Sequence, residues 1–301
     1  MAASVSNTTT VQYPIWIDGD NIYCDEAKLK EHLTQKLNYN ENDADGIIQQ
    51  INEHIKRSLP DNFWWSAAEN MSTEAIRVLL RSVEHSQLIC LLSYQDDFGY
   101  TALHWCADNK NNEVIKVILD SVSEEECYQL LSIRDNVEWT PLHESCARGD
   151  TESVTVMFNY VNQDMKYSLL QMTNYGSNTP LHSASTFGDG DVMKVIHDSV
   201  TQTQWINLLQ MENNGGLTVL HYAVYWNKQS SIMTIRDSVS DEEWLQLLST
   251  PLPEYNQRIH YFEDYYMYQE AVNTIDELRV AARVQSVLQT ENNSGMSSNN
   301  P

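Results

Sequence analysis

The chain has 301 residues, 42 of them acidic and 18 basic, which gives a net charge of −24. This charge would repel nucleic acid and anionic membrane surfaces, so we expect neither as a partner, whereas a basic segment of a protein would be attracted. The cysteines are five, an odd number, and include no Cys-x-x-Cys pair, which argues against both a disulfide framework and a zinc ribbon.

The start of the chain carries no targeting pattern. Residues 1–8 show neither a basic region nor an apolar run. Nowhere does the sequence approach the ~18 consecutive apolar residues of a membrane-spanning helix. We therefore expect a soluble protein, and we place it in the cytoplasm.

Residues 1–61 are expected to cover one end of the fold. The polar stretch 1–12 is predicted to be disordered. Apolar residues alternate around Asp18-Gly19 within 13–24, which indicates a short hairpin. A calcium loop is disfavoured there because Leu29 stands where the twelfth-position Glu is needed.

Two helices are predicted to follow, over residues 25–37 and 43–59. The second carries isoleucines at 47, 48, 51 and 55, which fall on one stripe of a helix. These helices are expected to cap the central part of the chain, and a separate binding element is the alternative.

Residues 62–249 contain one unit repeated at a fixed spacing. A tetrapeptide of the type Thr-Pro-Leu-His starts at Thr101, Thr140, Thr179 and Thr218, each 39 residues after the last. Leu-Leu pairs recur at the same spacing, and the register extends back to a fifth copy near Phe63. A fixed period of this length predicts stacked repeats rather than one closed core.

The motif Thr-Pro-Leu-His, with Asp135 before it, resembles the ankyrin repeat, a turn followed by two antiparallel helices. The resemblance implies an all-α, ankyrin-like repeat solenoid. The family unit has about 33 residues, so each copy here carries roughly six more. They follow the second helix, begin with capping patterns such as Ser123 with Glu126, and are predicted to form a third short helix.

Residues 250–301 are expected to cap the other end. Pro251 and Pro253 end the repeat register. Apolar residues at 271, 275, 278 and 282 predict a capping helix, and the Asn- and Ser-rich residues from Glu291 onward predict a disordered tail.

Four histidines recur in register but do not indicate a metal site. Helices pack about 8–10 Å apart, whereas zinc needs each ligand at about 2.0–2.1 Å. In the ankyrin family the matching histidine is structural and bonds near the Thr hydroxyl. No enzyme motif occurs, so we expect no catalytic residues, no metal and no cofactor. The matching histidines are His104, His143, His182 and His221.

The first helix of each repeat has variable positions, and the resemblance implies that these face a concave binding surface. Large aromatic residues occupy several of them, which favours recognition because Trp, Tyr and Arg dominate interface hot spots. For Tyr222, Tyr225 and Trp226, which lie in the last repeat, burial under the C-terminal segment is an equal alternative. The candidate partner-binding residues are Tyr100, Trp105, Asp108, Trp139, Glu144, Arg148, Phe187, Tyr222, Tyr225 and Trp226.

These observations predict a non-catalytic protein–protein interaction module or scaffold. The partner is expected to be a protein with a basic segment, bound on the concave face. The alternative is an acidic decoy that occupies a basic or nucleic-acid-binding surface of another protein by charge alone. An enzyme site within residues 1–61 has little support, because so short a stretch buries a core poorly.

Overall fold

The computed structural model describes residues 13–18, 21–57, 60–186, 190–252 and 265–296, with side chains left out at 18, 56–57, 60–62, 265–269 and 286–296. The chain divides into two compact units, residues 1–136 and 137–301. Each unit is described by itself below. The predicted disorder of residues 1–12 lies outside the described residues.

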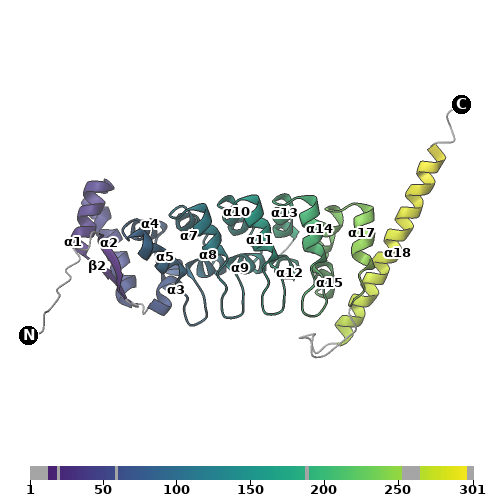
Figure 1. Ribbon diagram of the computed structural model, residues 1–301, viewed down its shortest axis with the longest axis horizontal. Coiled ribbons are helices and arrows are strands. Elements are labelled where there is room, and N and C mark those ends of the chain that lie inside the picture. The colour runs from purple at the N-terminus through teal and green to yellow at the C-terminus, as the bar shows by residue number, and fades with distance from the viewer. Residues whose placement is uncertain (1–12, 19–20, 58–59, 187–189, 253–264, 297–301) are drawn as a thin grey trace, which may run out of the picture. The chain divides into compact units, whose positions relative to one another are not determined.

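The first unit begins with a two-stranded antiparallel hairpin, as expected, and continues with helices (Figure 1). The predicted first helix ends in a π-helical turn, and the second starts slightly earlier than expected, at Glu41. Its elements are β1 (Ile15–Asp18), β2 (Asn21–Cys24), α1 (Glu26–Glu31), η1 (His32–Lys36), α2 (Glu41–Arg57), α3 (Pro60–Asn70), α4 (Thr73–Arg81), α5 (His85–Ser93), α6 (Ala102–Asp108), α7 (Asn112–Leu119) and α8 (Glu124–Leu131).

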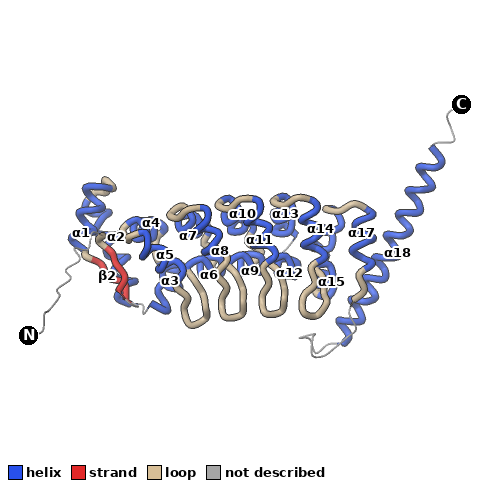
Figure 2. The backbone as a smooth tube through the Cα atoms, viewed as in Figure 1, coloured by secondary structure: helices blue, strands red, loops and turns tan. Residues whose placement is uncertain are grey.

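The second unit consists of helices and the loops between them (Figure 2). Its elements are α9 (Pro141–Ala147), α10 (Thr151–Asn159), α11 (Gln163–Gln171), α12 (Pro180–Thr186), α13 (Gly190–Asp198), α14 (Gln202–Gln210), α15 (Val219–Tyr225), α16 (Gln229–Asp237), α17 (Asp241–Ser249) and α18 (Tyr265–Met296).

Each repeat contains three helices, so the extra residues form the predicted third helix. The prediction of an all-α repeat solenoid is confirmed, with the β1–β2 hairpin as the one sheet in the described residues. In the described part of the chain, no helix is both long and apolar enough to cross a membrane.

Small residues allow the first helices to pack closely. The position two residues beyond each repeated histidine is fully buried, and it is occupied by Cys106, Ser145, Ala184 and Ala223. In the second unit, α12 contacts both α9 and α15, and α13 contacts both α10 and α16. First helices therefore pack on first helices and second helices on second helices, which is how a repeat protein builds a continuous core.

The third helices begin with the capping boxes that the sequence predicts. Ser123 and Glu126 cap α8 reciprocally. The backbone N–H and the hydroxyl of Ser123 lower the pKa of Glu126 to about 2, with a smaller contribution from the bonded His85. The same box recurs at Thr201 with Gln204 and at Ser240 with Glu243, and Asn162 caps α11. Part of the acidic charge is thus placed at the positive ends of helices.

Helix α18 packs against α15 and α17 and buries Ala271 and Ile275 there (Figure 1). Nε of Arg279 donates to the carbonyl oxygen of Leu248 over 2.6 Å, and its Nη2 donates to that of Thr250 over 3.2 Å. The helix continues to Met296, beyond Glu291, where we expected an irregular tail. In the described part, α18 therefore covers the last repeat.

Candidate protein-binding surface

The repeated Thr–His pair fixes the start of each first helix. In α9, the N–H of Thr140 donates to Nδ1 of His143 over 3.2 Å, and the Thr140 hydroxyl lies 2.8 Å from the same nitrogen. The N–H of His143 donates back to the hydroxyl oxygen over 3.4 Å. The same backbone bond to Nδ1, at 3.2 Å, occurs in the other three repeats, at His104, His182 and His221.

The other ring nitrogen holds a backbone segment further along the chain. Nε2 of His182 lies 3.1 Å from the carbonyl oxygen of Leu217, and Nε2 of His221 lies 3.2 Å from that of Thr250. Because Nδ1 accepts, the ring proton sits on Nε2 and donates to these carbonyls. Burial lowers the pKa of both histidines to about 4, and the positive charge of Arg279 adds to this at His221. These rings are therefore neutral structural donors.

The loops before α6, α12 and α15 are each built by one acceptor side chain and one left-handed residue, and the loop before α9 also contains a left-handed residue. In the first unit, Oδ1 of Asp96 accepts the N–H groups of Phe98 and Tyr100 over 2.9 and 2.8 Å. Asn174 and Asn213 make the equivalent pairs of bonds at 2.9–3.0 Å and 2.9 Å. The left-handed residues of the successive loops are Gly99, Glu138, Ser177 and Gly216, with φ of +79°, +63°, +57° and +71°.

Adjacent loops are joined by backbone hydrogen bonds. In the first unit, the N–H of Asn136 donates to the carbonyl oxygen of Phe98 over 3.1 Å. In the second unit, Tyr175 donates to Val137 over 3.3 Å and Asn214 donates to Gly176 over 3.0 Å. Figure 2 shows the loops before α12 and α15 side by side. These bonds make the loops ordered supports for their side chains.

The first unit carries a side-chain cluster beside its loop, formed by Asp96, Tyr100 and Trp105. Oδ2 of Asp96 accepts the indole N–H of Trp105 over 2.8 Å. The ring of Tyr100 packs edge-on against Trp105 at 4.8 Å and stacks on His104 at 5.3 Å. Tyr100 and Trp105 are half-buried, whereas Phe98 at the tip is 66% exposed. Of the predicted residues, the structure therefore brings Tyr100 and Trp105 together, and Asp108 is half-buried on the same helix.

In the second unit, the loop tips present Val137 and Tyr175, which are 53% and 68% exposed. Among the predicted residues nearby, Trp139 is half-buried, and its ring lies 6.1 Å from that of His143. Glu144 is buried, with a carboxylate oxygen 4.0 Å from Nε of the exposed Arg148. Glu144 thus offers little surface, whereas Arg148 projects from the end of α9.

The predicted residues of the last repeat are partly covered. Tyr225 is buried and Trp226 is half-buried, with their rings 5.6 Å apart. The hydroxyl of Tyr222 accepts a hydrogen bond from the side chain of Asn213 over 3.1 Å. The predicted Phe187 lies outside the described residues. Tyr222 and Trp226 keep partial exposure, so they remain candidates.

Sequence reasoning missed the tip residues Phe98, Val137 and Tyr175. They obey no strict register, since Phe98 and Val137 are 39 residues apart while Tyr175 falls one position earlier in its loop. A sequence feature that would have marked them is a large apolar residue between the Asp or Asn acceptor and the motif threonine.

Comparison with known proteins supports the fold. Residues 98–124, from the tip of the first-unit loop to the start of α8, match the family model of the ankyrin repeat. A search of curated proteins found no match to this chain. Among the described residues, no three His, Cys, Asp or Glu side chains are grouped as a metal site requires.

Proposed function

We propose that this chain, which is an ankyrin-repeat protein, binds a protein partner through its first helices and the loops before them, without catalysis. Ankyrin repeats mediate protein–protein binding. The observation that carries the proposal is the exposure of Phe98, Val137 and Tyr175 at 66%, 53% and 68%. The loop backbone is built by other residues, so the fold does not need these apolar side chains at the tips.

The ordered loops favour tight binding. Binding costs free energy when flexible loops and side chains must be immobilised. Here the loop backbone is already held by Asp96 in the first unit and by Asn174 in the second. In the first unit, Trp105 is oriented by its bond to Asp96 and by Tyr100. Preordered aromatic side chains of this kind are typical interface anchors.

The charge of the chain favours a partner with a basic segment. The net charge of −24 would speed the approach of such a partner, and salt would slow it. The acidic decoy is the alternative, in which charge alone would provide the affinity. The two hypotheses differ in the affinity they predict once the apolar tip side chains are removed: it falls if the tips bind the partner and stays unchanged if charge alone does.

The test is affinity capture with four baits, wild type and three variants of the full chain, followed by measurement of the Kd of the captured protein. Two variants change the tips: Phe98→Ser, and Val137→Ser combined with Tyr175→Ser. The matched control is Met233→Ser, because Met233 is 62% exposed and belongs to helix α16 rather than to a loop.

We expect one partner to bind wild type and the control equally and to bind either tip variant about tenfold or more weakly, as for interface hot spots. Basic proteins that all four baits retain equally, and that salt releases, would replace our proposal with the decoy. Equal weakening by Met233→Ser would show that the loops are not the contact surface.

A further inference from the structure

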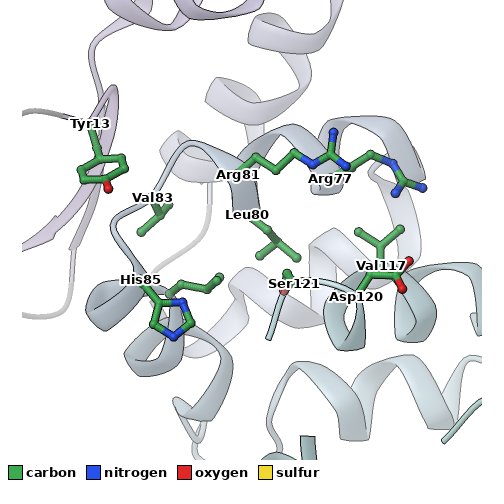
Figure 3. Close-up of a pocket in the computed structure, with 10 residues that line it drawn as sticks. Tyr13, Arg77, Leu80, Arg81, Val83, His85, Val117, Asp120 and Ser121 are labelled. Carbon is green, nitrogen blue, oxygen red and sulfur yellow. The ribbon is translucent and has the colours of Figure 1, made fainter. Parts of the chain in front are cut away.

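A hollow of about 370 Å³ lies in the first unit between α4, the start of α5 and the end of α7 (Figure 3). Arg77 and Arg81 lie along α4 on one side of it, and His85 lies on the opposite side. Leu80 lies between them, and Tyr13 stands at the end nearest the hairpin. Three basic side chains therefore line one hollow in a chain that carries only 18 Lys and Arg residues against 42 acids.

The basic residues depart from the repeat pattern at this place. At the register position of Arg81, the four later repeats carry Asp or Asn, namely Asp120, Asn159, Asp198 and Asp237. At the register position of His85, they carry acids or amides, namely Glu124, Gln163, Gln202 and Asp241. The repeat fold therefore does not require positive charge at either position. An arginine and a histidine thus replace acids and amides at two positions that face the same hollow.

The two arginines beside the hollow keep hydrogen-bond donors that no other bond uses within the described residues. Arg77 uses Nε for Glu74, at 3.3 Å, and its terminal amino groups make no hydrogen bond within the described residues. Arg81 is exposed, and no ion pair of Arg81 is found within the same part of the chain. His85 is bonded through Nε2 to Glu126 at 2.8 Å. The two arginines lie one helical turn apart, so both guanidinium groups can reach one anion.

The floor of the hollow is apolar. Leu80, Val83, Leu88 and Val117 contribute to it, and each is almost fully buried. Small-molecule sites usually have volumes of about 300–1,000 Å³, a mostly apolar lining and a few polar groups that orient the ligand. The hollow has a volume in this range and a small apolar floor, and its polar groups include the two arginines, His85 and the carboxylate of Asp120.

We propose that this hollow binds an organic anion, in which a carboxylate or phosphate is attached to a short apolar body. The anionic group would lie against Arg77 and Arg81, since guanidinium groups bind such anions with two parallel hydrogen bonds. The apolar body would cover Leu80 and Val117. The residues of this site are not those of the loop surface, so a result that disproves anion binding would leave the proposal of partner binding unaffected.

The test is NMR titration of the ¹⁵N-labelled full chain with four probes: hexyl phosphate, hexanoate, inorganic phosphate and hexanol. We expect saturable shifts of the backbone amides in 77–88 and 117–121 with hexyl phosphate, hexanoate or both. Those two arms distinguish a phosphate ligand from a carboxylate ligand. Equal affinity for inorganic phosphate or for hexanol would overturn the proposal, because it requires both halves of the ligand.

Variants of the charged residues around the hollow test whether positive charge promotes binding and negative charge opposes it. Arg77→Asp combined with Arg81→Asp should weaken binding about tenfold or more, as expected for the loss of charge-assisted hydrogen bonds. Asp120→Asn should strengthen binding severalfold, a gain that misfolding cannot mimic. Lys194→Asp is the matched control, because Lys194 is exposed at the register position of Arg77 in a later repeat. An equal loss with this control, or no gain with Asp120→Asn, would refute the site.

Discussion

The loop Asp96–Tyr100 of the first unit and the loop Asn213–Leu217 of the second are built by the same bonds but end in different side chains. Asp96 and Asn213 each accept two backbone N–H groups, and Gly99 and Gly216 each adopt a left-handed conformation. The tip of the first loop is the exposed Phe98, whereas the matching position of the last loop is the buried Gly215.

The difference separates what the fold needs from what it leaves open. The acceptor side chain and the supporting histidine recur because each forms hydrogen bonds with backbone groups. The left-handed residue recurs because the turn requires a positive φ at that position. The tip side chain satisfies nothing in the loop, so it is free to differ. We therefore expect large effects on stability from changes to the recurring positions and small effects from changes to the tips.

Acidification should have the largest effect, through the histidines that hold the loops. The pKa of His182 and of His221 is about 4 in the folded chain, against an ordinary value of 6.5. Below pH 6.5 the unfolded chain binds protons that the folded chain excludes, so the free energy of unfolding falls as pH falls. Each histidine should contribute a loss of about 1.4 kcal/mol per pH unit, which ends near pH 4.

Urea unfolding between pH 7.5 and pH 5 would measure this slope while staying above the isoelectric point of about 4.5. His182→Gln removes one titrating ring, and we expect it to reduce the slope by about 1.4 kcal/mol per pH unit. An unchanged slope would mean that His182 is not held neutral by the bond to Leu217 and by its burial.

Gly99→Ala should have the next largest effect. A Cβ atom on Gly99, at φ +79°, would lie 2.5 Å from the backbone nitrogen of Asn136, which donates to the neighbouring Phe98 carbonyl. Backbone strain together with this clash should cost about 2–3 kcal/mol. The control is Gly46→Ala in α2, where a Cβ atom meets nothing within 4 Å. That change should stabilise the chain by about 0.5–1 kcal/mol. In thermal unfolding, the Tm should therefore fall for Gly99→Ala and rise for Gly46→Ala.

A smaller effect is expected at the ends of the first helices. Lys110 and Gly149 occupy the same register position, with φ of +55° and +66°, directly after the C-cap residues of α6 and α9. Glycine is favoured here because it has no side chain to strain. Lys110→Gly should therefore raise the free energy of unfolding by about 0.5–1 kcal/mol, and Gly149→Lys should lower it by about as much. Changes of the same sign in both variants would contradict this account.

The sequence was sufficient to predict the recurring positions because they repeat. The Thr–His pairs and the capping boxes appear at fixed spacing, and one physical role explains every copy. The burial of Glu144 could not be predicted, and that of Tyr225 was only one of two equal alternatives, because burial at these positions depends on packing around single copies. The hollow beside Arg81 was missed because its lining comes from separate elements. Its trace in the sequence is the replacement of acids and amides by Arg81 and His85 at their register positions.

The smallest effect on stability is expected at Phe98, where function and fold separate most clearly. Phe98 is 66% exposed, and the loop uses only its backbone, through the bonds to Asp96 and Asn136. Phe98→Ser should change the free energy of unfolding by less than about 0.5 kcal/mol, as for surface positions without a structural role. Urea unfolding of this variant beside Gly99→Ala compares adjacent residues of one loop. A loss above about 1 kcal/mol at Phe98 would show that its ring supports the loop, and its exposure would then no longer argue for a partner.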